Sequence, residues 1–310
     1  MLKKYEKIFQ VKEEYMCPSG RSCPGCGGGI LTRITSKAVG KNVLMSSGSC
    51  GTNSTGIFPV GSMTKYPVPI SLLGGCGAAL AGMEISAKIK GKEDATILGI
   101  VGDGDAVDIG FGSLSGMFER RHKVLVVIQD NQGYAATGGQ RSGTTPWKVW
   151  TRNTPWGKAR APKYMPLIML AHDAPYVATC SVAYPEDIFD KVQRATKKEN
   201  QPAYIQCITP CSVNWKNESW MAVEVARQAV TCGIWPLWEY ERGVFRRTVV
   251  SKEPTPLKDY MKLQRRYDHL TEEDVKELQE YIKELNEKID RFAKVYSKDS
   301  KIEYKFPEAS

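Results

Sequence analysis

Two short turns rich in acidic and amide side chains stand at corresponding places in the middle of the sequence. Asp103 lies in Gly-Asp-Gly-Asp, directly after an apolar run at residues 97–101, and Asn131 follows Asp130 after a second apolar run at 124–128. A carboxylate and an amide oxygen are hard ligands that suit Mg²⁺. Glycines beside them allow the backbone to approach a phosphate closely. These residue types indicate a diphosphate held through a magnesium ion.

The elements that must position these turns can be read from the same stretch. Apolar runs of this kind, joined by one helical segment, are typical of neighbouring parallel strands buried on both faces. Ligands of such sheets bind beyond the carboxyl ends of the strands, where both turns would lie. Gly-Asp-Gly alone is a common turn, so the flanking strands carry the argument. A dinucleotide site is disfavoured, because no Gly-x-Gly-x-x-Gly motif opens the first helix.

A second candidate site is formed by cysteines. The chain has nine of them and no secretory signal pattern, which argues against a disulfide framework. Cys23 and Cys26 stand in a Cys-Pro-Gly-Cys-Gly loop that could present two thiolates to one metal. Cys50, in a glycine-rich loop, and Cys211, in Thr-Pro-Cys after a predicted strand, are the candidates for the other two ligands. Local chemistry leaves zinc and an iron–sulfur cluster both open, and Cys17 could replace one of the four.

Composition limits the class of protein. The 310 residues are 42% hydrophobic and 25% charged, as is ordinary for a soluble globular protein. No apolar run approaches the length of a membrane span, and the first residues lack a signal-peptide core, so we expect a cytoplasmic protein. The net charge of +9 comes from scattered lysines and arginines. This distribution favours an acidic protein partner over nucleic acid.

The pattern along the chain predicts one α/β domain over residues 1–245. Helices are predicted at 28–39, 75–90, 163–172, 185–198 and 218–232, and strands at 42–46, 97–101, 124–128, 176–180 and 204–208. The long loops 47–69 and 135–162 are of the kind that usually has a function. The alternation of strands and helices predicts a doubly wound, mostly parallel sheet.

Residues 246–310 differ in character and are predicted to form a C-terminal extension. Thr271 is a good N-cap followed by acidic residues, which suit the positive end of a helix. Apolar residues then recur every three or four positions from Val275 to Phe292, which predicts a long amphipathic helix. We interpret this helix as an arm that contacts another subunit.

Taken together, these features resemble the β subunit of 2-oxoacid:ferredoxin oxidoreductases, the family of the pyruvate and oxalate enzymes. The likeness covers residues 15–245 and is most specific at 130–134 (Asp-Asn-Gln-Gly-Tyr) and 137–142 (Thr-Gly-Gly-Gln-Arg-Ser). It implies the diphosphate-binding half of a thiamin-diphosphate-binding fold. The cofactor-binding residues that it implies are Gly102, Asp103, Gly104, Asp105, Asn131, Gly133 and Tyr134.

The resemblance also implies two metal sites and a reaction. The implied Mg²⁺ ligands are Asp103, Asn131 and the carbonyl of Gly133, and the implied ligands of one [4Fe–4S] cluster are Cys23, Cys26, Cys50 and Cys211. Another subunit would supply the pyrimidine-binding domain with its activating Glu. The implied reaction is the oxidative decarboxylation of a small 2-oxoacid, with electrons passed through the cluster to ferredoxin. For pyruvate, coenzyme A would accept the acyl group.

The substrate and two other functional classes stay open at this point. Residues 147–152 are bulkier and more basic than the pyruvate enzymes lead us to expect, and Arg152 could pair with a carboxylate of a dianion such as oxalate. Equally, Lys148 and Arg152 could be solvated or paired with a partner subunit. A non-redox thiamin-diphosphate enzyme would leave the cysteines unexplained. A zinc-stabilised structural subunit would leave Asp103 and Asn131 unexplained.

Overall fold

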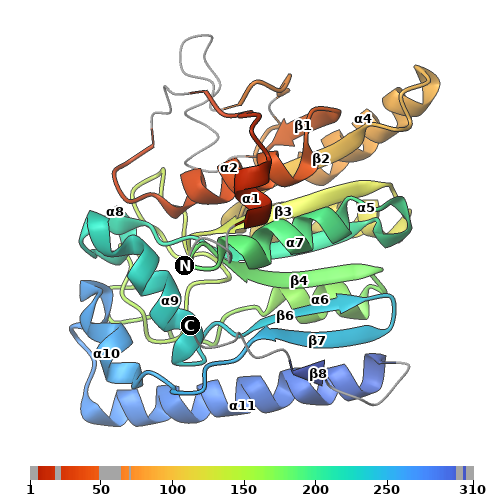
Figure 1. The fold of residues 1–310 in the computed structure, drawn as a ribbon. Helices are drawn as coiled ribbons and strands as arrows, with labels where there is room; N and C mark the ends of the chain where they lie inside the picture. Colours follow the sequence, from red (N-terminus) through yellow and green to blue (C-terminus); the bar gives the residue numbers. More distant parts are fainter. Residues whose placement is uncertain (1–5, 18–21, 49–63, 70, 298–302, 305–310) are drawn as a thin grey trace.

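The fold is built on one sheet, seen in the computed structural model, which describes residues 6–17, 22–48, 64–69, 71–297 and 303–304. Within these ranges eight strands follow the order β1-β2-β3-β5-β4-β6-β7-β8 (Figure 1). They are β1 (Val43–Ser47), β2 (Thr96–Gly102), β3 (Val124–Asp130), β4 (Tyr176–Ser181), β5 (Ala203–Ile208), β6 (Leu237–Glu241), β7 (Val244–Val249) and β8 (Glu303–Tyr304). All five strands predicted from the sequence are present.

The direction of the strands changes across the sheet. The first five strands pair in parallel, with β5 lying between β3 and β4. The predicted mostly parallel sheet is therefore confirmed. Beyond β4, the antiparallel hairpin β6–β7 extends the sheet, and this hairpin was not predicted. Its two-residue turn, Arg242 and Gly243, has φ angles of 48° and 97°, as a type I′ hairpin turn requires.

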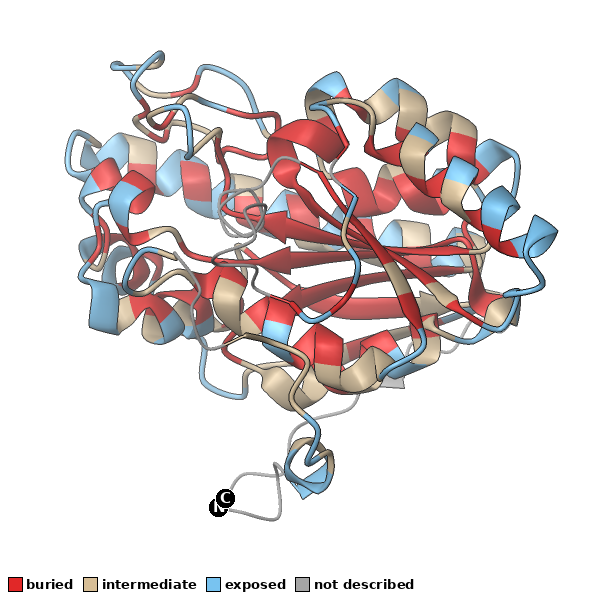
Figure 2. Cartoon of the chain, turned by 90° about the horizontal axis from the view of Figure 1, so that it is seen from above, coloured by how far each residue is buried: buried red, intermediate tan, exposed pale blue. Residues whose placement is uncertain are grey.

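Helices cover both faces of the sheet. They are α1 (Glu6–Gln10), α2 (Gly27–Val39), α4 (Cys76–Ile89), α5 (Phe111–Glu119), α6 (Met165–Ala171), α7 (Pro185–Ala195), α8 (Ser212–Trp215), α9 (Ala222–Thr231), α10 (Leu257–Lys262) and α11 (Glu272–Tyr296). Apolar side chains of α4, α5, α6 and α11 pack on one face, and those of α2 and α7 pack on the other. The central strands are buried between these layers (Figure 2), so their polar ends are the natural place for a site.

The C-terminal helix α11 packs against its own chain. The apolar stripe predicted along it is buried, and Leu285, Ile289 and Ala293 join the core beneath α6. The interpretation of this helix as an arm that contacts another subunit is therefore wrong for its apolar face. An amphipathic pattern shows that a face is buried but does not show against what. Strand β7 also crosses the boundary predicted at residues 245–246, so the extension continues the same sheet.

The expected N-cap of α11 is present in full. The Thr271 hydroxyl accepts from the backbone N–H of Asp274, and the Asp274 carboxylate accepts in return from the N–H of Thr271. Among the described residues, no helix combines the length and apolar character needed to cross a bilayer.

Candidate cofactor and metal site

Two buried carboxylates lie side by side where β2 and β3 end. Asp103 directly follows β2, Asp130 is the last residue of β3, and the register pairs Gly102 with Gln129. The two side chains are only 1% and 0% exposed, respectively. The strands are neighbours and parallel, so the turns at their carboxyl ends meet at one edge of the sheet, as the sequence predicts.

Within the described residues, this pair accepts hydrogen bonds from hydroxyl groups but from no cation. Ser142 Oγ donates to Asp103 Oδ2 at 2.5 Å, and Thr144 Oγ1 lies 2.8 Å from both Asp103 Oδ2 and Asp130 Oδ1. A hydroxyl has one hydrogen and can donate to only one carboxylate at a time. Burial, and then the charge of Asp130, raise the pKa of Asp103 to about 8, and burial likewise raises the pKa of Asp130. The metal-free pair is therefore set up to keep a proton.

Asp130 is held more firmly than Asp103. Its second oxygen accepts from Gln206 Nε2 at 2.7 Å, and Oδ1 also accepts from the backbone N–H of Gln132 at 2.9 Å. Because these donors fix Asp130, its role is to support the turn. Asp103 Oδ1 instead faces Asn131.

Three oxygen atoms, one each from Asp103, Asn131 and Gly133, lie close together. The side-chain oxygen of Asn131 lies 3.1 Å from Asp103 Oδ1 and 2.7 Å from the carbonyl oxygen of Gly133; with the amide turned over, its nitrogen would donate to both. With the oxygen inward, three acceptors face one point. Octahedral Mg²⁺ with ligands at about 2.0–2.1 Å places neighbouring ligand oxygens about 2.9 Å apart, and the two separations bracket that value. The donor set therefore fits a magnesium ion.

The predicted cofactor-binding residues line one small cavity. It measures about 60 Å³, and its walls include Gly102, Asp103, Gly104, Asp105, Asn131, Gly133 and Tyr134. Two of the glycines are required by close packing. A Cβ atom on Gly104 would lie 2.4 Å from the Tyr134 ring, and one on Gly133 would lie 2.6 Å from Asn214 Nδ2. The structure thus brings all seven residues together.

The cysteine loops are joined to each other by hydrogen bonds. The N–H of Gly27, next to Cys26, donates to the Pro210 carbonyl at 3.1 Å, and Ser212 Oγ donates to the Pro24 carbonyl at 2.9 Å. Cys23, Cys26 and Cys211 therefore lie on adjacent loops, whereas Cys50 lies outside the described residues. In the part of the chain that is described, no three Cys, His, Asp or Glu side chains meet closely enough to hold a metal.

Cys211 has an environment that suits a thiolate ligand. Burial raises the pKa of its thiol and the nearby sulfurs Cys26 and Cys23 raise it further, while the backbone N–H groups of Asn214 and Val213 oppose this by hydrogen bonding to the sulfur. N–H groups directed at a ligating sulfur are one of the means by which a protein tunes an iron–sulfur cluster. These groups are in place at the start of α8.

The basic loop after the site divides into two parts. Lys148 forms ion pairs with Asp274 and Glu277 of α11, so this lysine faces away from the cavity. Arg152 is exposed, and its N–H donates to the Gly139 carbonyl at 3.1 Å. A Cβ atom on Gly138 would lie 3.7 Å from Arg152 Nη1, which places the guanidinium beside the loop that borders the cavity.

Comparison with known proteins identifies the family. Residues 47–207 match the family described as "Thiamine pyrophosphate enzyme, C-terminal TPP binding domain". The chain is 40% identical over 279 residues to pyruvate synthase subunit PorB of Methanothermobacter thermautotrophicus, covering 87% of this chain and 96% of the relative. It is 36% identical over 298 residues to ketoisovalerate oxidoreductase subunit VorB of Pyrococcus furiosus, covering 92% and 95%. The chain belongs to the β subunits of 2-oxoacid:ferredoxin oxidoreductases.

A solved structure agrees with the fold of this β subunit. A chain of 2-oxoglutarate:ferredoxin oxidoreductase from Magnetococcus marinus is similar with a TM-score of 0.57 and 24% identity, covering 69% of this chain and 79% of that chain. The predicted family and enzyme class are confirmed: the chain is a subunit of a multisubunit oxidoreductase and contains a thiamin-pyrophosphate-binding domain.

Several residues of the site were not found from the sequence of this β subunit. They include Thr144, which bridges the carboxylates, Gln206, which holds Asp130, and Trp215, whose indole N–H donates to the Asn131 carbonyl at 2.7 Å. Gln206 and Trp215 lie more than seventy positions from their partners. Ser142 and Thr144 lie in the loop 135–162 expected to have a function, but their hydroxyl bonds to Asp103 could not be read from the sequence.

Proposed function

We propose that this β subunit holds thiamin diphosphate through Mg²⁺ and passes electrons through a [4Fe–4S] cluster to ferredoxin, in the oxidative decarboxylation of a small 2-oxoacid. We favour pyruvate as the substrate, with coenzyme A as the acyl acceptor. When bound, thiamin diphosphate supplies the nucleophilic carbon and the electron sink for this reaction. The residues of this chain bind and orient the cofactors.

The observation that carries the proposal is the group of three oxygens from Asp103, Asn131 and Gly133. Two are side-chain oxygens at the ends of neighbouring strands, and the third is a backbone carbonyl. Among the described residues, no cation lies at hydrogen-bond distance from either carboxylate, so a bound metal ion would supply the missing positive charge and also bind the anionic diphosphate. Gly104 keeps the backbone beside this point free of a Cβ atom.

The size of the cavity supports a site completed by another subunit. Its volume of about 60 Å³ is well below the about 300–1,000 Å³ of complete small-molecule pockets. Leu73 on its wall and Leu72 beside it are 43% and 86% exposed, so apolar surface is available next to the cavity for a partner chain. That partner would supply the pyrimidine-binding domain with its activating Glu.

The cluster is assigned to Cys23, Cys26, Cys50 and Cys211. The hydrogen bonds between the first and last of these loops, and the N–H groups directed at Cys211, support the assignment. Cys180 and Cys207 are fully buried inside β4 and β5, and burial raises the pKa of Cys207 well above its usual range. These two thiols are therefore poor candidates for metal ligands.

The first test is anaerobic purification of the complex, followed by analysis of iron, sulfide and thiamin. Cys211→Ala should lose iron and electron transfer to ferredoxin while thiamin diphosphate remains bound, because the two sites use different side chains. The matched control is Cys232→Ala, which removes a half-buried cysteine at the end of α9. Full iron content in Cys211→Ala would exclude this cysteine as a ligand.

The substrate is tested at Arg152, the arginine that remains beside the cavity. A charged hydrogen bond to a substrate carboxylate contributes about 1.5–3 kcal/mol, so Arg152→Ala should lower kcat/KM for pyruvate by about 10–100-fold. Arg160→Ala, at another exposed arginine of the same loop, should leave it unchanged. A loss confined to oxalate would instead identify a dianionic substrate. No loss with either acid would remove Arg152 from the site.

A further inference from the structure

Gln132 has an unusual backbone conformation between two of the oxygen donors. Its φ angle is 61°, in the left-handed region that side chains other than glycine rarely adopt. Asn131, the residue before it, contributes its side-chain oxygen, and Gly133, the residue after it, contributes its carbonyl oxygen. The left-handed turn at Gln132 is therefore what directs both oxygens to the same point. Such strain persists only where surrounding contacts hold it.

Arg266 supplies one of these contacts from the C-terminal extension. It lies in the 3₁₀ turn Arg265–Tyr267, is only 1% exposed, and its Nη2 donates to Gln132 Oε1 at 2.8 Å. Its Nε donates to Gln264 Oε1 at 2.8 Å. Among the described residues, no carboxylate lies within ion-pair distance of its guanidinium. The charge of Arg266 opposes the effect of burial on the pKa of Asp130, the residue before Asn131, so this buried arginine acts on the turn and not through a direct ion pair.

Trp215 lies between Arg266 and the same turn. The Arg266 guanidinium stacks on the indole at 3.8 Å, and the indole N–H donates to the Asn131 carbonyl at 2.7 Å. Trp215 is the last residue of α8, and its backbone N–H bonds to the carbonyl of Cys211. One stack of two side chains thus contacts the turn at two successive residues and is anchored beside a predicted cluster ligand.

We propose that Arg266 and Trp215 are positioning residues that hold the Asn131–Gly133 turn in its left-handed conformation, with its oxygens directed at the metal. This inference rests on the proposed magnesium site. It gives the C-terminal extension a task in cofactor binding, although none of its described residues lines the cavity.

The test measures the affinity of the assembled complex, saturated with thiamin diphosphate, for Mn²⁺ as the metal probe. Free Mn²⁺ is quantified by electron paramagnetic resonance. Trp215→Phe keeps an aromatic ring but removes the indole N–H and its hydrogen bond to the Asn131 carbonyl. This change should raise the Mn²⁺ dissociation constant about tenfold. Arg266→Met should raise it further. The matched control, Trp235→Phe, loses an indole bond to the Cys180 carbonyl elsewhere in the sheet and should leave it unchanged.

A second substitution separates positioning from general stability. Gln132→Gly introduces a residue that adopts a φ angle of 61° without strain, so Arg266→Met with Gln132→Gly should regain most of the lost Mn²⁺ affinity. A purely structural role for Arg266 would give no such rescue. Normal Mn²⁺ affinity in Trp215→Phe, or no rescue by Gln132→Gly, would overturn the inference. A wild-type complex that binds no Mn²⁺ would instead refute the proposed function.

Discussion

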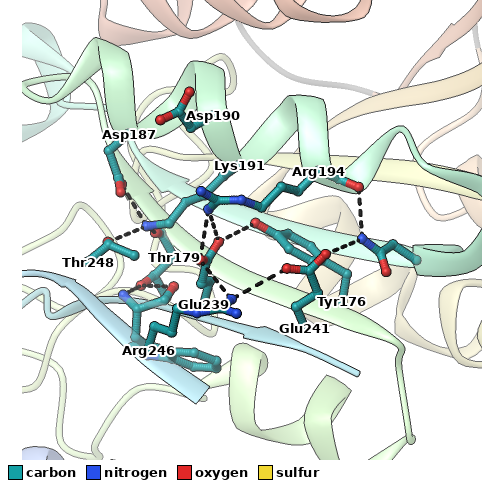
Figure 3. A network of polar contacts seen from close by, with 12 residues as sticks. Tyr176, Thr179, Asp187, Asp190, Lys191, Arg194, Glu239, Glu241, Arg246 and Thr248 are labelled. Atoms are coloured by element: carbon teal, nitrogen blue, oxygen red, sulfur yellow. Dashed lines mark hydrogen bonds and ion pairs between the residues drawn. The ribbon is translucent and has the colours of Figure 1, made fainter. Parts of the chain in front are cut away.

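Two buried polar clusters in this sheet differ in whether their acidic side chains are paired with basic ones. In the cluster around Glu239, acids and bases alternate: Glu239 accepts from Arg194 at 2.7 Å and from the Tyr176 hydroxyl at 2.8 Å (Figure 3). Lys191, fully buried, donates to Asp187 at 2.6 Å. At the ends of β2 and β3, Asp103 and Asp130 are equally buried, but their hydrogen-bond donors among the described residues are hydroxyl, amide and backbone groups.

The difference shows in the pKa values of the acids. Burial alone would raise the pKa of Glu239, but Lys191 and Arg194 outweigh it and hold the value below the usual range. No such compensation acts on Asp103, whose pKa rises to about 8. A cluster that is neutralised internally stabilises the fold, whereas one that is left negative is suited to bind a cation. The contrast supports the proposed metal site without reference to any relative.

The largest effect is expected at the balanced cluster. Glu239→Gln removes the acid that pairs with Arg194 and Arg246, and breaking a buried ion pair from one side costs about 3–5 kcal/mol. Urea unfolding of the cofactor-free chain should show this loss, with Mn²⁺ affinity of the complex unchanged. Glu241→Gln, on the same strand but more exposed, is the control and should cost much less. A loss of metal affinity in Glu239→Gln would end the distinction between the clusters.

The opposite pattern is expected at the unbalanced cluster. Asp103→Asn removes the charged member of the three-oxygen set, so the affinity for Mn²⁺ and thiamin diphosphate should fall by at least about 100-fold, since losing an outer-shell partner alone costs about 10–100-fold. Isothermal titration of the complex measures this. Stability of the cofactor-free chain should not fall. Retained cofactor binding would contradict the metal role of Asp103.

For each pH unit, the smallest effect is a pH dependence that belongs to Asp103. A carboxyl with a pKa of about 8 in the folded chain and an ordinary value in the unfolded chain binds more protons when folded. Its contribution to stability is therefore full in acid and is lost as the pH rises toward 8, by at most about 1.4 kcal/mol for each pH unit. Asp103→Asn should flatten the pH profile of urea unfolding between pH 5 and 8. An unchanged profile would assign the slope to other groups.

Much of the fold followed from local pattern, because buried parallel strands and small-residue helices have distinctive compositions. The strand ends at Asp103 and Asn131 were predicted for this reason. The β6–β7 hairpin was missed, since Arg242-Gly243 is a weak turn signal and the strands carry charged residues such as Glu239 and Arg246. Their partners lie on other elements, and only the folded chain shows that these charges are paired.

The site was predictable where function is carried by residues close in sequence and unpredictable where it depends on distant ones. The three oxygens of the proposed metal site fall within two short motifs, and the two described cysteine loops, assigned to one cluster by the resemblance, are joined by hydrogen bonds. Lys148 was assigned to the substrate cleft as one alternative, but Asp274 and Glu277 lie more than 120 positions away and pair with it. Long-range partners of this kind leave no periodic trace in the sequence.

The contact between Arg266 and Gln132 also sets an order of events during synthesis. It joins residues 134 positions apart, and a chain emerging from its N-terminus completes the strands of the parallel sheet long before residue 266 exists. Contacts of such separation form late, because closing a long loop is entropically slow. The turn that faces the cofactor would therefore gain its final support only when the last part of the chain has folded.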